Sequence, residues 1–146
     1  MHILPPSPEH YDAWVKLWHG YQNFYEISLA DEVARYTWER FLDANGPVHC
    51  ALAVEGNQPI GFVHWIYHHS TWTHGQYCYL QDLYVAADRR SKGTGRRLIE
   101  HVYEHAAGQK AARVYWLTHK SNAPAIHLYD QVADDAGFIQ YRKNMG

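Results

Sequence analysis

Cysteine is scarce in this chain. Cys50 and Cys78 are the only two among 146 residues, and both lie in segments that read as strands. Small buried thiols are common in strands, and this pair has the spacing of neither a disulfide framework nor a zinc site. Such sparing use of cysteine is typical of a reducing compartment, so we expect a cytoplasmic protein.

Long hydrophobic runs and an excess of positive charge are also missing. No apolar stretch approaches the roughly 18 residues of a membrane-spanning helix, and no charged segment followed by an apolar one opens the chain. The 13 lysines and arginines are outnumbered by 15 acidic residues, which gives a net charge of −2. General nucleic-acid binding needs a broad basic face. We therefore expect no membrane insertion, no standard export signal and no nucleic-acid partner.

Aromatic residues are abundant, with 6 tryptophans, 12 tyrosines and 4 phenylalanines in a chain that is 47% hydrophobic. A chain of this length and composition is expected to form one ordinary domain, here 1–146. Its aromatic side chains either pack in a core and a dimer face or line a pocket for a small or cationic ligand. An exposed aromatic face would fit a homodimer, which is the oligomer we expect.

Hydrophobic periodicity predicts helices and strands in a mixed order. Segment 1–4 reads as a short strand, and Ser7 with Pro8 opens a helix that carries Trp14, Trp18, Tyr21 and Tyr25 on one face. The remaining predicted elements are a helix from Asp31 to Gly46, a hairpin over 48–68, a strand over 76–85, a helix from Gly95 to Gly108, a strand over 113–118, a helix over 121–132 and a last strand over 137–143. Hairpins followed by alternating strands and helices indicate an α+β, or mixed α/β, domain.

The stretch "DRRSKGTGRRLIEHVY" at 88–103 concentrates positive charge. Five of the 13 lysines and arginines fall within 89–97, around two glycines and just before an amphipathic helix. Cations are unfavourable at a helix N-terminus unless an anion compensates them, and a glycine turn there exposes backbone N–H groups. These features favour a bound phosphate or pyrophosphate. The spacing Arg90-x-x-Gly93-x-Gly95 is by itself a weak pattern that also suits a surface turn with solvated charges.

The segments around this loop carry a family resemblance. "YLQDLYVAADRRSKGTGRRLIEHVYEHA" followed by "VYWLTHKSNAPAIHLYDQV" resembles the Gcn5-related N-acetyltransferases (GNAT), from about Tyr77 to Val132. The two motifs look closest to the branch of polyamine, thialysine and yeast histone and polyamine acetyltransferases. The resemblance implies a GNAT-like fold, with a mostly antiparallel central sheet of about six to seven strands and helices on both faces. It also implies acetyl-CoA (coenzyme A) as cosubstrate.

The same resemblance implies the residues that bind this cosubstrate. The backbone from Arg90 to Gly95, with Arg96, would hold the pyrophosphate, while Leu83 and Val85 would pair with the acetyl carbonyl and the pantetheine. Asn122 would lie beside the pantetheine arm. The whole predicted set is Leu83, Tyr84, Val85, Arg90, Ser91, Lys92, Gly93, Thr94, Gly95, Arg96, Asn122, Ala125 and Tyr129.

Acetyl transfer to an amine needs a group that takes the amine proton and an acid for the departing thiolate. Tyr129 lies seven residues after Asn122, on the same helix face, and matches the family's general acid. The base departs from the family pattern, because polyamine acetyltransferases carry a carboxylate where this chain has Gln81 in "LQD". Asp82 is then either the base or a structural partner of a cation or turn. Gln81 either holds a water that leads to Asp82 or Glu26, or takes no part in catalysis. Strand alternation would point Gln81 and Asp82 to opposite faces, but a β-bulge would expose both side chains.

The predicted acceptor site lies in "GYQNFYEISLADE". Tyr25 and Glu26 offer an aromatic face and a carboxylate, and together with Gln81 and Asp82 they form the predicted acceptor-binding set. An aromatic face beside a carboxylate suits an aliphatic ammonium. Packed helices with solvated carboxylates are the alternative. The resemblance implies an N-acetyltransferase of a small primary amine: a polyamine, a lysine analogue or an amino acid. A protein or histone lysine acetyltransferase and a non-catalytic acyl-CoA-binding regulatory module are the competing interpretations.

Histidine is frequent, with 12 copies, and His64, His68, His69 and His74 raise the question of a metal site. Their spacing matches no standard zinc motif. On a strand, His64 and His68 would share a face only at a separation of about 13 Å, which is too far for one ion. We therefore expect no metal.

Overall fold

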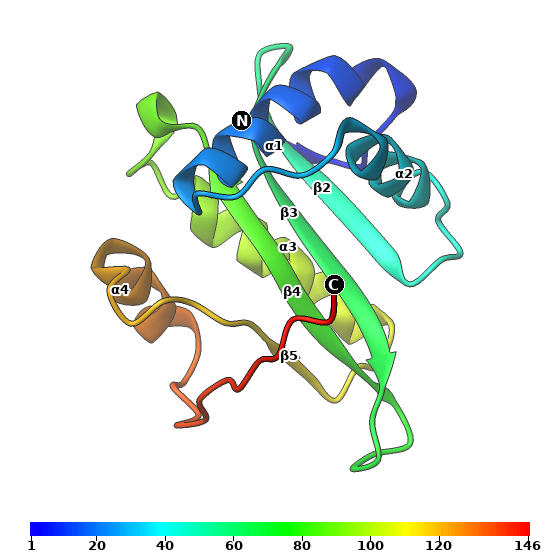
Figure 1. Ribbon diagram of the computed structural model, residues 1–146, viewed down its shortest axis with the longest axis vertical. Coiled ribbons are helices and arrows are strands. Elements are labelled where there is room, and N and C mark those ends of the chain that lie inside the picture. Colours follow the sequence, from blue (N-terminus) through cyan, green and yellow to red (C-terminus); the bar gives the residue numbers. More distant parts are fainter.

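A five-stranded mixed sheet forms the centre of the computed structural model, which describes residues 1–146 (Figure 1). Its strands are β1 (His2–Leu4), β2 (Val48–Glu55), β3 (Gln58–His69), β4 (Gln76–Val85) and β5 (Arg113–Tyr115). They lie side by side in chain order. Neighbouring strands run antiparallel except for β4 and β5, which are parallel.

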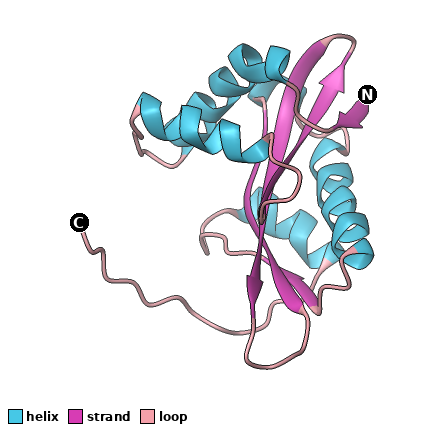
Figure 2. Cartoon of the chain, turned by 90° about the vertical axis from the view of Figure 1, so that its right-hand side faces the viewer, coloured by secondary structure: helices cyan, strands magenta, loops and turns pink.

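Helices cover both faces of this sheet (Figure 2). They are α1 (Tyr11–Phe24), which follows a 3₁₀ turn at Pro8–His10, α2 (Asp31–Phe41), α3 (Thr94–Gly108) and α4 (Ala123–Val132). α1 and α2 pack on one face and α3 on the other, and α4 contacts the core on the α3 side. None of these helices has both the length and the apolar character that crossing a membrane requires.

Two expectations at the C-terminal end are wrong. The sheet has five strands rather than six to seven, and residues 137–143 form no strand. Phe138 and Tyr141 in this segment are 83% and 89% exposed. A strand is stable only when a neighbour satisfies its backbone hydrogen bonds. Because β5 ends at Tyr115, short of the predicted 118, it offers no long edge with which residues 137–143 could pair.

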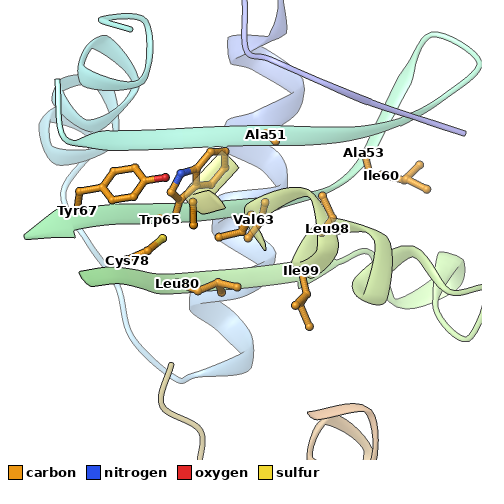
Figure 3. Close-up of a cluster of buried hydrophobic side chains, with 12 residues drawn as sticks. Ala51, Ala53, Ile60, Val63, Trp65, Tyr67, Cys78, Leu80, Leu98 and Ile99 are labelled. Atoms are coloured by element: carbon orange, nitrogen blue, oxygen red, sulfur yellow. The ribbon is translucent and has the colours of Figure 1, made fainter. Parts of the chain in front are cut away.

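The core on the α3 side is aliphatic at its centre (Figure 3). Leu98 and Ile99 of α3 are fully buried against the sheet, where Val63 and Trp65 of β3 and Leu80 of β4 meet them. The predicted apolar face of this helix therefore packs as its spacing indicates.

The aromatic face of α1 forms the core on the opposite side of the sheet. Its successive rings contact one another, with centroids 5.7 Å apart for Trp14 and Trp18, 5.1 Å for Trp18 and Tyr21, and 4.8 Å for Tyr21 and Tyr25. Trp14 and Trp18 are buried. The predicted shared face is confirmed, and its first two residues are core side chains rather than a dimer surface.

A β-bulge interrupts the pairing of β3 with β4. His64 pairs with Asp82 and the next residue, Trp65, pairs with Leu80, so Gln81 is left without a partner on β3. In a regular strand, residues two apart share a face. Here Leu80 belongs to the core on the α3 side, whereas Asp82 contacts Tyr21 of α1. The extra residue therefore turns the Asp82 side chain to the other face of the sheet.

Leu98→Ala tests the aliphatic core. We expect a loss of about 2–5 kcal/mol in the free energy of unfolding, because truncating a fully buried leucine leaves a cavity. Urea denaturation followed by circular dichroism measures this loss. Ile139→Ala, at an exposed position of the C-terminal segment, is the control and should change the free energy by less than about 0.5 kcal/mol. Equal losses in the two variants would contradict this fold.

Candidate active site

A cavity of about 630 Å³ lies between the end of β4, the start of α3 and α4. β5 pairs with β4 only over Tyr77–Tyr79, so Leu83–Val85 have no partner strand on that edge. In Figure 1, α4 lies apart from the end of β4 and outside the sheet. Backbone N–H and C=O groups on a free strand edge are available to pair with an extended ligand.

Twelve of the thirteen residues predicted to bind the cosubstrate line this cavity, and Lys92 is the one that does not. The structure also brings in residues that the sequence reasoning missed: Phe24 from the end of α1, and Pro124, His127, Leu128 and Gln131 from α4. The four on α4 follow the spacing i, i+3, i+4 and i+7. Helical periodicity around Ala125 would have found this face.

The start of α3 is built to receive an anion. Ser91 and Gly93 both have left-handed backbone conformations, with φ of 68° and 80°, and Gly93 is the N-cap of the helix. The first N–H groups of a helix have no partner within it, and the helix dipole places positive potential there. The first turn of α3 contains no acidic residue to neutralise that potential.

Two arginines line the cavity at this anion-binding end. Arg96 donates a hydrogen bond to the Gln131 side chain at 2.7 Å and so links α3 to α4. Arg90 donates from Nε to the Val85 carbonyl oxygen at 2.8 Å, and its guanidinium lies over the Tyr84 ring. Arg90 is exposed and Arg96 is half-buried beside the backbone turn, an arrangement that suits a phosphate or pyrophosphate.

Tyr129 lines the same cavity from α4. Its ring meets Trp116 edge to face, with centroids 5.3 Å apart. Burial, and then the neighbouring Tyr25 phenol, raise the pKa of Tyr129 to about 12. The hydroxyl therefore keeps its proton at neutral pH and is in the right form to act as an acid.

Asp82 lies outside the cavity lining, in a buried network with α1 and β3. Its Oδ1 accepts a hydrogen bond from the Tyr21 hydroxyl at 2.6 Å, and its Oδ2 lies 2.8 Å from His64 Nδ1. Asp82 is 9% exposed and has no lysine or arginine partner. Burial, together with the Asp82 charge, raises the pKa of Tyr21, so this phenol stays a donor.

Tyr25 connects this network to the cavity. It lines the cavity, its ring contacts Tyr21, and burial followed by the charge of Asp82 raises its pKa. It also borders a second hollow, of about 470 Å³, whose wall includes Glu26 and His119. Gln81 is exposed on the bulge and lines neither space. Tyr25 thus borders both spaces and contacts the buried network of Asp82, whereas Glu26 lines only the second hollow.

The four histidines considered for metal binding are not gathered together. His64 is buried among aromatic rings, His69 and His74 are exposed, and His68 contacts the Tyr115 hydroxyl at 2.8 Å. No three histidine, cysteine or acidic side chains are arranged to hold a metal ion.

Chemically, these parts form one cavity lined by two arginines at the start of α3 and by a protonated phenol on α4, with a buried carboxylate outside its lining. Such a space suits an elongated anionic ligand whose reactive end reaches the aromatic side. The chain matches a family model described as "Acetyltransferase (GNAT) family" over residues 12–133.

Relatives of known name agree with this match. The chain is 39% identical over 140 residues to D-amino-acid N-acetyltransferase HPA3 of Saccharomyces cerevisiae. The aligned region covers 94% of this chain and 87% of the relative. It is 28% identical over 130 residues to the thialysine N-epsilon-acetyltransferase of Caenorhabditis elegans, with 89% and 80% covered. These are the branches that the sequence motifs predict.

Solved structures share the fold. A probable acetyltransferase superposes with a TM-score of 0.86 at 24% identity, covering 100% of this chain and 99% of the other. The aminoglycoside acetyltransferase AAC(6')-Iy, in complex with a bisubstrate analogue that contains CoA, superposes with a TM-score of 0.84 at 18% identity, covering 99% and 98%. The family match and the named relatives, together with the shared fold, show that the chain belongs to the GNAT family of acetyltransferases and is an N-acetyltransferase.

Proposed function

We propose that the protein transfers the acetyl group of acetyl-CoA to the primary amine of a small molecule, such as an amino acid, a lysine analogue or a polyamine. The observation that carries this proposal is the single cavity that begins at the cationic start of α3 and ends beside Tyr129 and Tyr25. The named relatives support a small acceptor, because one acts on D-amino acids and another on thialysine.

The residues present fit acetyl-CoA, which supplies an activated acetyl thioester. The turn from Arg90 to Gly95 and the Arg96 side chain would hold the pyrophosphate through backbone N–H groups and charge. The free edge of Leu83–Val85 would pair with the pantetheine and the acetyl carbonyl, with Asn122 and Ala125 on the opposite wall. Gly95 faces Leu128, and an added Cβ there would lie 3.4 Å from its side chain, so a larger residue would narrow the cavity.

The aromatic end would bind the acceptor amine. Phenols of Tyr21 and Tyr25 and the buried carboxylate of Asp82 suit an ammonium group, and Glu26 in the adjoining hollow suits a second positive group of the acceptor. In the transfer step the amine nitrogen bonds to the acetyl carbon and the carbon–sulfur bond breaks. Asp82, directly or through a water held by Gln81, takes the amine proton, and Tyr129 gives its proton to the departing sulfur.

Two competing functions differ from this proposal in one feature each. A protein lysine acetyltransferase would take the same ammonium on a peptide, and a non-catalytic acyl-CoA-binding module would bind the cosubstrate without turnover. Gln81, which replaces the expected carboxylate, is the residue that favours the non-catalytic module; the hydrogen-bonded carboxylate at Asp82 favours catalysis. Homodimer formation and a cytoplasmic location stay predictions from the sequence.

The first test is release of coenzyme A thiol from acetyl-CoA with a panel of acceptors: D- and L-amino acids, lysine, thialysine, spermidine, an aminoglycoside and a histone-tail peptide. We expect one class of small amine to exceed the peptide clearly. A preference for the peptide would favour the protein acetyltransferase. If no acceptor of the panel caused release of thiol and coenzyme A still bound, the result would favour the non-catalytic module.

Arg96→Ala tests the anion-binding end. We expect coenzyme A to bind about tenfold more weakly, because a charge-assisted contact to the pyrophosphate is lost. Isothermal titration calorimetry measures the affinity. Arg97→Ala is the matched control, since this neighbouring cation donates to the Met1 carbonyl oxygen and does not line the cavity. Equal weakening in both variants would mean that only overall charge matters.

Tyr129→Phe tests the acid. We expect kcat to fall about 100-fold, because general acid catalysis is lost. The factor should be the same at pH 7 and pH 9, since a phenol with a pKa of about 12 keeps its proton at both. Tyr103→Phe, on α3 and outside the cavity lining, should leave kcat little changed. An unchanged kcat in Tyr129→Phe would remove this residue from the chemistry.

A further inference from the structure

A chain of hydrogen bonds runs from the core to the proposed acceptor site. The indole Nε1–H of Trp14 donates to His64 Nε2 at 3.0 Å, and His64 Nδ1 lies 2.8 Å from Asp82 Oδ2. Trp14 is fully buried and His64 is 3% exposed. His64 therefore has both ring nitrogens engaged within the protein and out of contact with bulk water.

The chemistry of the indole decides which form of His64 fits. An indole N–H is a donor only, so the His64 nitrogen that it meets must offer a lone pair. The single proton of the neutral ring then lies on Nδ1, where it is donated to Asp82. A doubly protonated ring would set two N–H groups against each other across 3.0 Å.

Packing holds the ring in this orientation. Phe62 stacks on His64 with centroids 4.3 Å apart, and Phe41 of α2 lies at 4.5 Å. Rotation of the imidazole to exchange its nitrogens would break both hydrogen bonds among apolar neighbours, where unsatisfied polar groups are costly.

The groups around Asp82 leave its charge uncompensated. Tyr21 and Tyr25 face it from α1, the Cys50 thiol from β2 and Tyr79 from its own strand, and for each of these the Asp82 charge contributes to a raised pKa. All four stay neutral at neutral pH, and α2 contributes only the Phe41 ring to this packing. A protonated His64 would place a cation directly against Asp82, and the Trp14 N–H opposes that second proton.

We infer that Trp14 fixes His64 as a neutral positioning residue, so that Asp82 keeps a full negative charge for the ammonium group of the acceptor. The inference rests on the proposed role of Asp82 and narrows the acceptor to one that binds in its protonated form. It also gives α1 a function besides packing, since one of its core tryptophans determines the charge of the site.

Trp14→Phe, compared with Trp18→Phe, tests the inference through kinetics. Both tryptophans are buried on α1 and share an aromatic stack, but the Trp18 indole N–H has no hydrogen-bond partner. In Trp14→Phe, the His64 nitrogen that met the indole N–H no longer faces a donor, so it is free to take a second proton in acid. We expect the KM for the amine to rise about tenfold at pH 6, where an ion pair would neutralise Asp82, and to return near the wild-type value at pH 8. The kcat should also fall at pH 6 and recover at pH 8, because Asp82 is the proposed base as well, and Trp18→Phe should show neither pH-dependent change.

A second readout needs neither substrate nor turnover. The ¹⁵N chemical shifts of His64, assigned by comparison with His64→Asn, report which ring nitrogen carries a proton. In the wild-type protein we expect a proton on Nδ1 and none on Nε2 at both pH 6 and pH 8; in Trp14→Phe we expect both nitrogens protonated at pH 6. His64→Asn should retain activity, because its amide N–H can replace the Nδ1–H donor, whereas His64→Leu should not.

These measurements separate the two proposals. A doubly protonated His64 in the wild-type protein at pH 6, or equal KM profiles for the two tryptophan variants, would overturn the inference. A locked neutral His64 combined with an Asp82→Asn variant of unchanged KM and kcat would instead overturn the proposed role of Asp82, and would leave Trp14 with no influence on the acceptor site.

Discussion

The bulge at Gln81 is the constraint on which the position of Asp82, and with it the proposed acceptor site, depends. By adding one residue to β4, it lets Leu80 remain in the aliphatic core while Asp82 faces α1. Without it, the strand period would turn Asp82 into the core below α3, where a carboxylate would have no donors. A local irregularity in one strand thus supplies the buried charge at the aromatic end.

The cavity proposed to bind the cosubstrate depends on a different interruption of the sheet. β4 and β5 pair over only three residues and then diverge, which leaves the edge of Leu83–Val85 free and opens the cavity toward α4. The turn before α3 directs helix N–H groups and arginines into the same opening. The free edge and the helix start converge because β4 leads directly into that turn.

Charges of opposite sign lie in and beside the cavity. Arg90 and Arg96 line it, while Asp82 is buried outside its lining and contacts Tyr21. Each charge is held by neutral donors or rings rather than by an opposite charge of the protein. Tyr21 and His64 donate to Asp82, and Arg90 lies over the Tyr84 ring. Neither charge is therefore neutralised by an opposite charge of the protein.

Local patterns in the sequence predict most of the elements, and the family resemblance implies most of the residues that line the cavity. Turn glycines, the apolar spacing of α3 and the charge of segment 89–97 act over a few residues, so they can be recognised without a fold. The predicted strand at 137–143 fails for the opposite reason. Its alternation is present, but a strand needs a partner edge that only the rest of the chain can supply.

The sequence by itself determined the family, the cationic glycine turn before α3 and the aromatic face of α1. Only the tertiary structure decided which groups form hydrogen bonds with Asp82 and His64, because these partners lie far away along the chain. Tyr21 is 61 residues from Asp82, and Trp14 is 50 residues from His64. The face of a side chain after a bulge and the tautomer of a buried imidazole follow from three-dimensional contacts. No pattern of nearby residues records them.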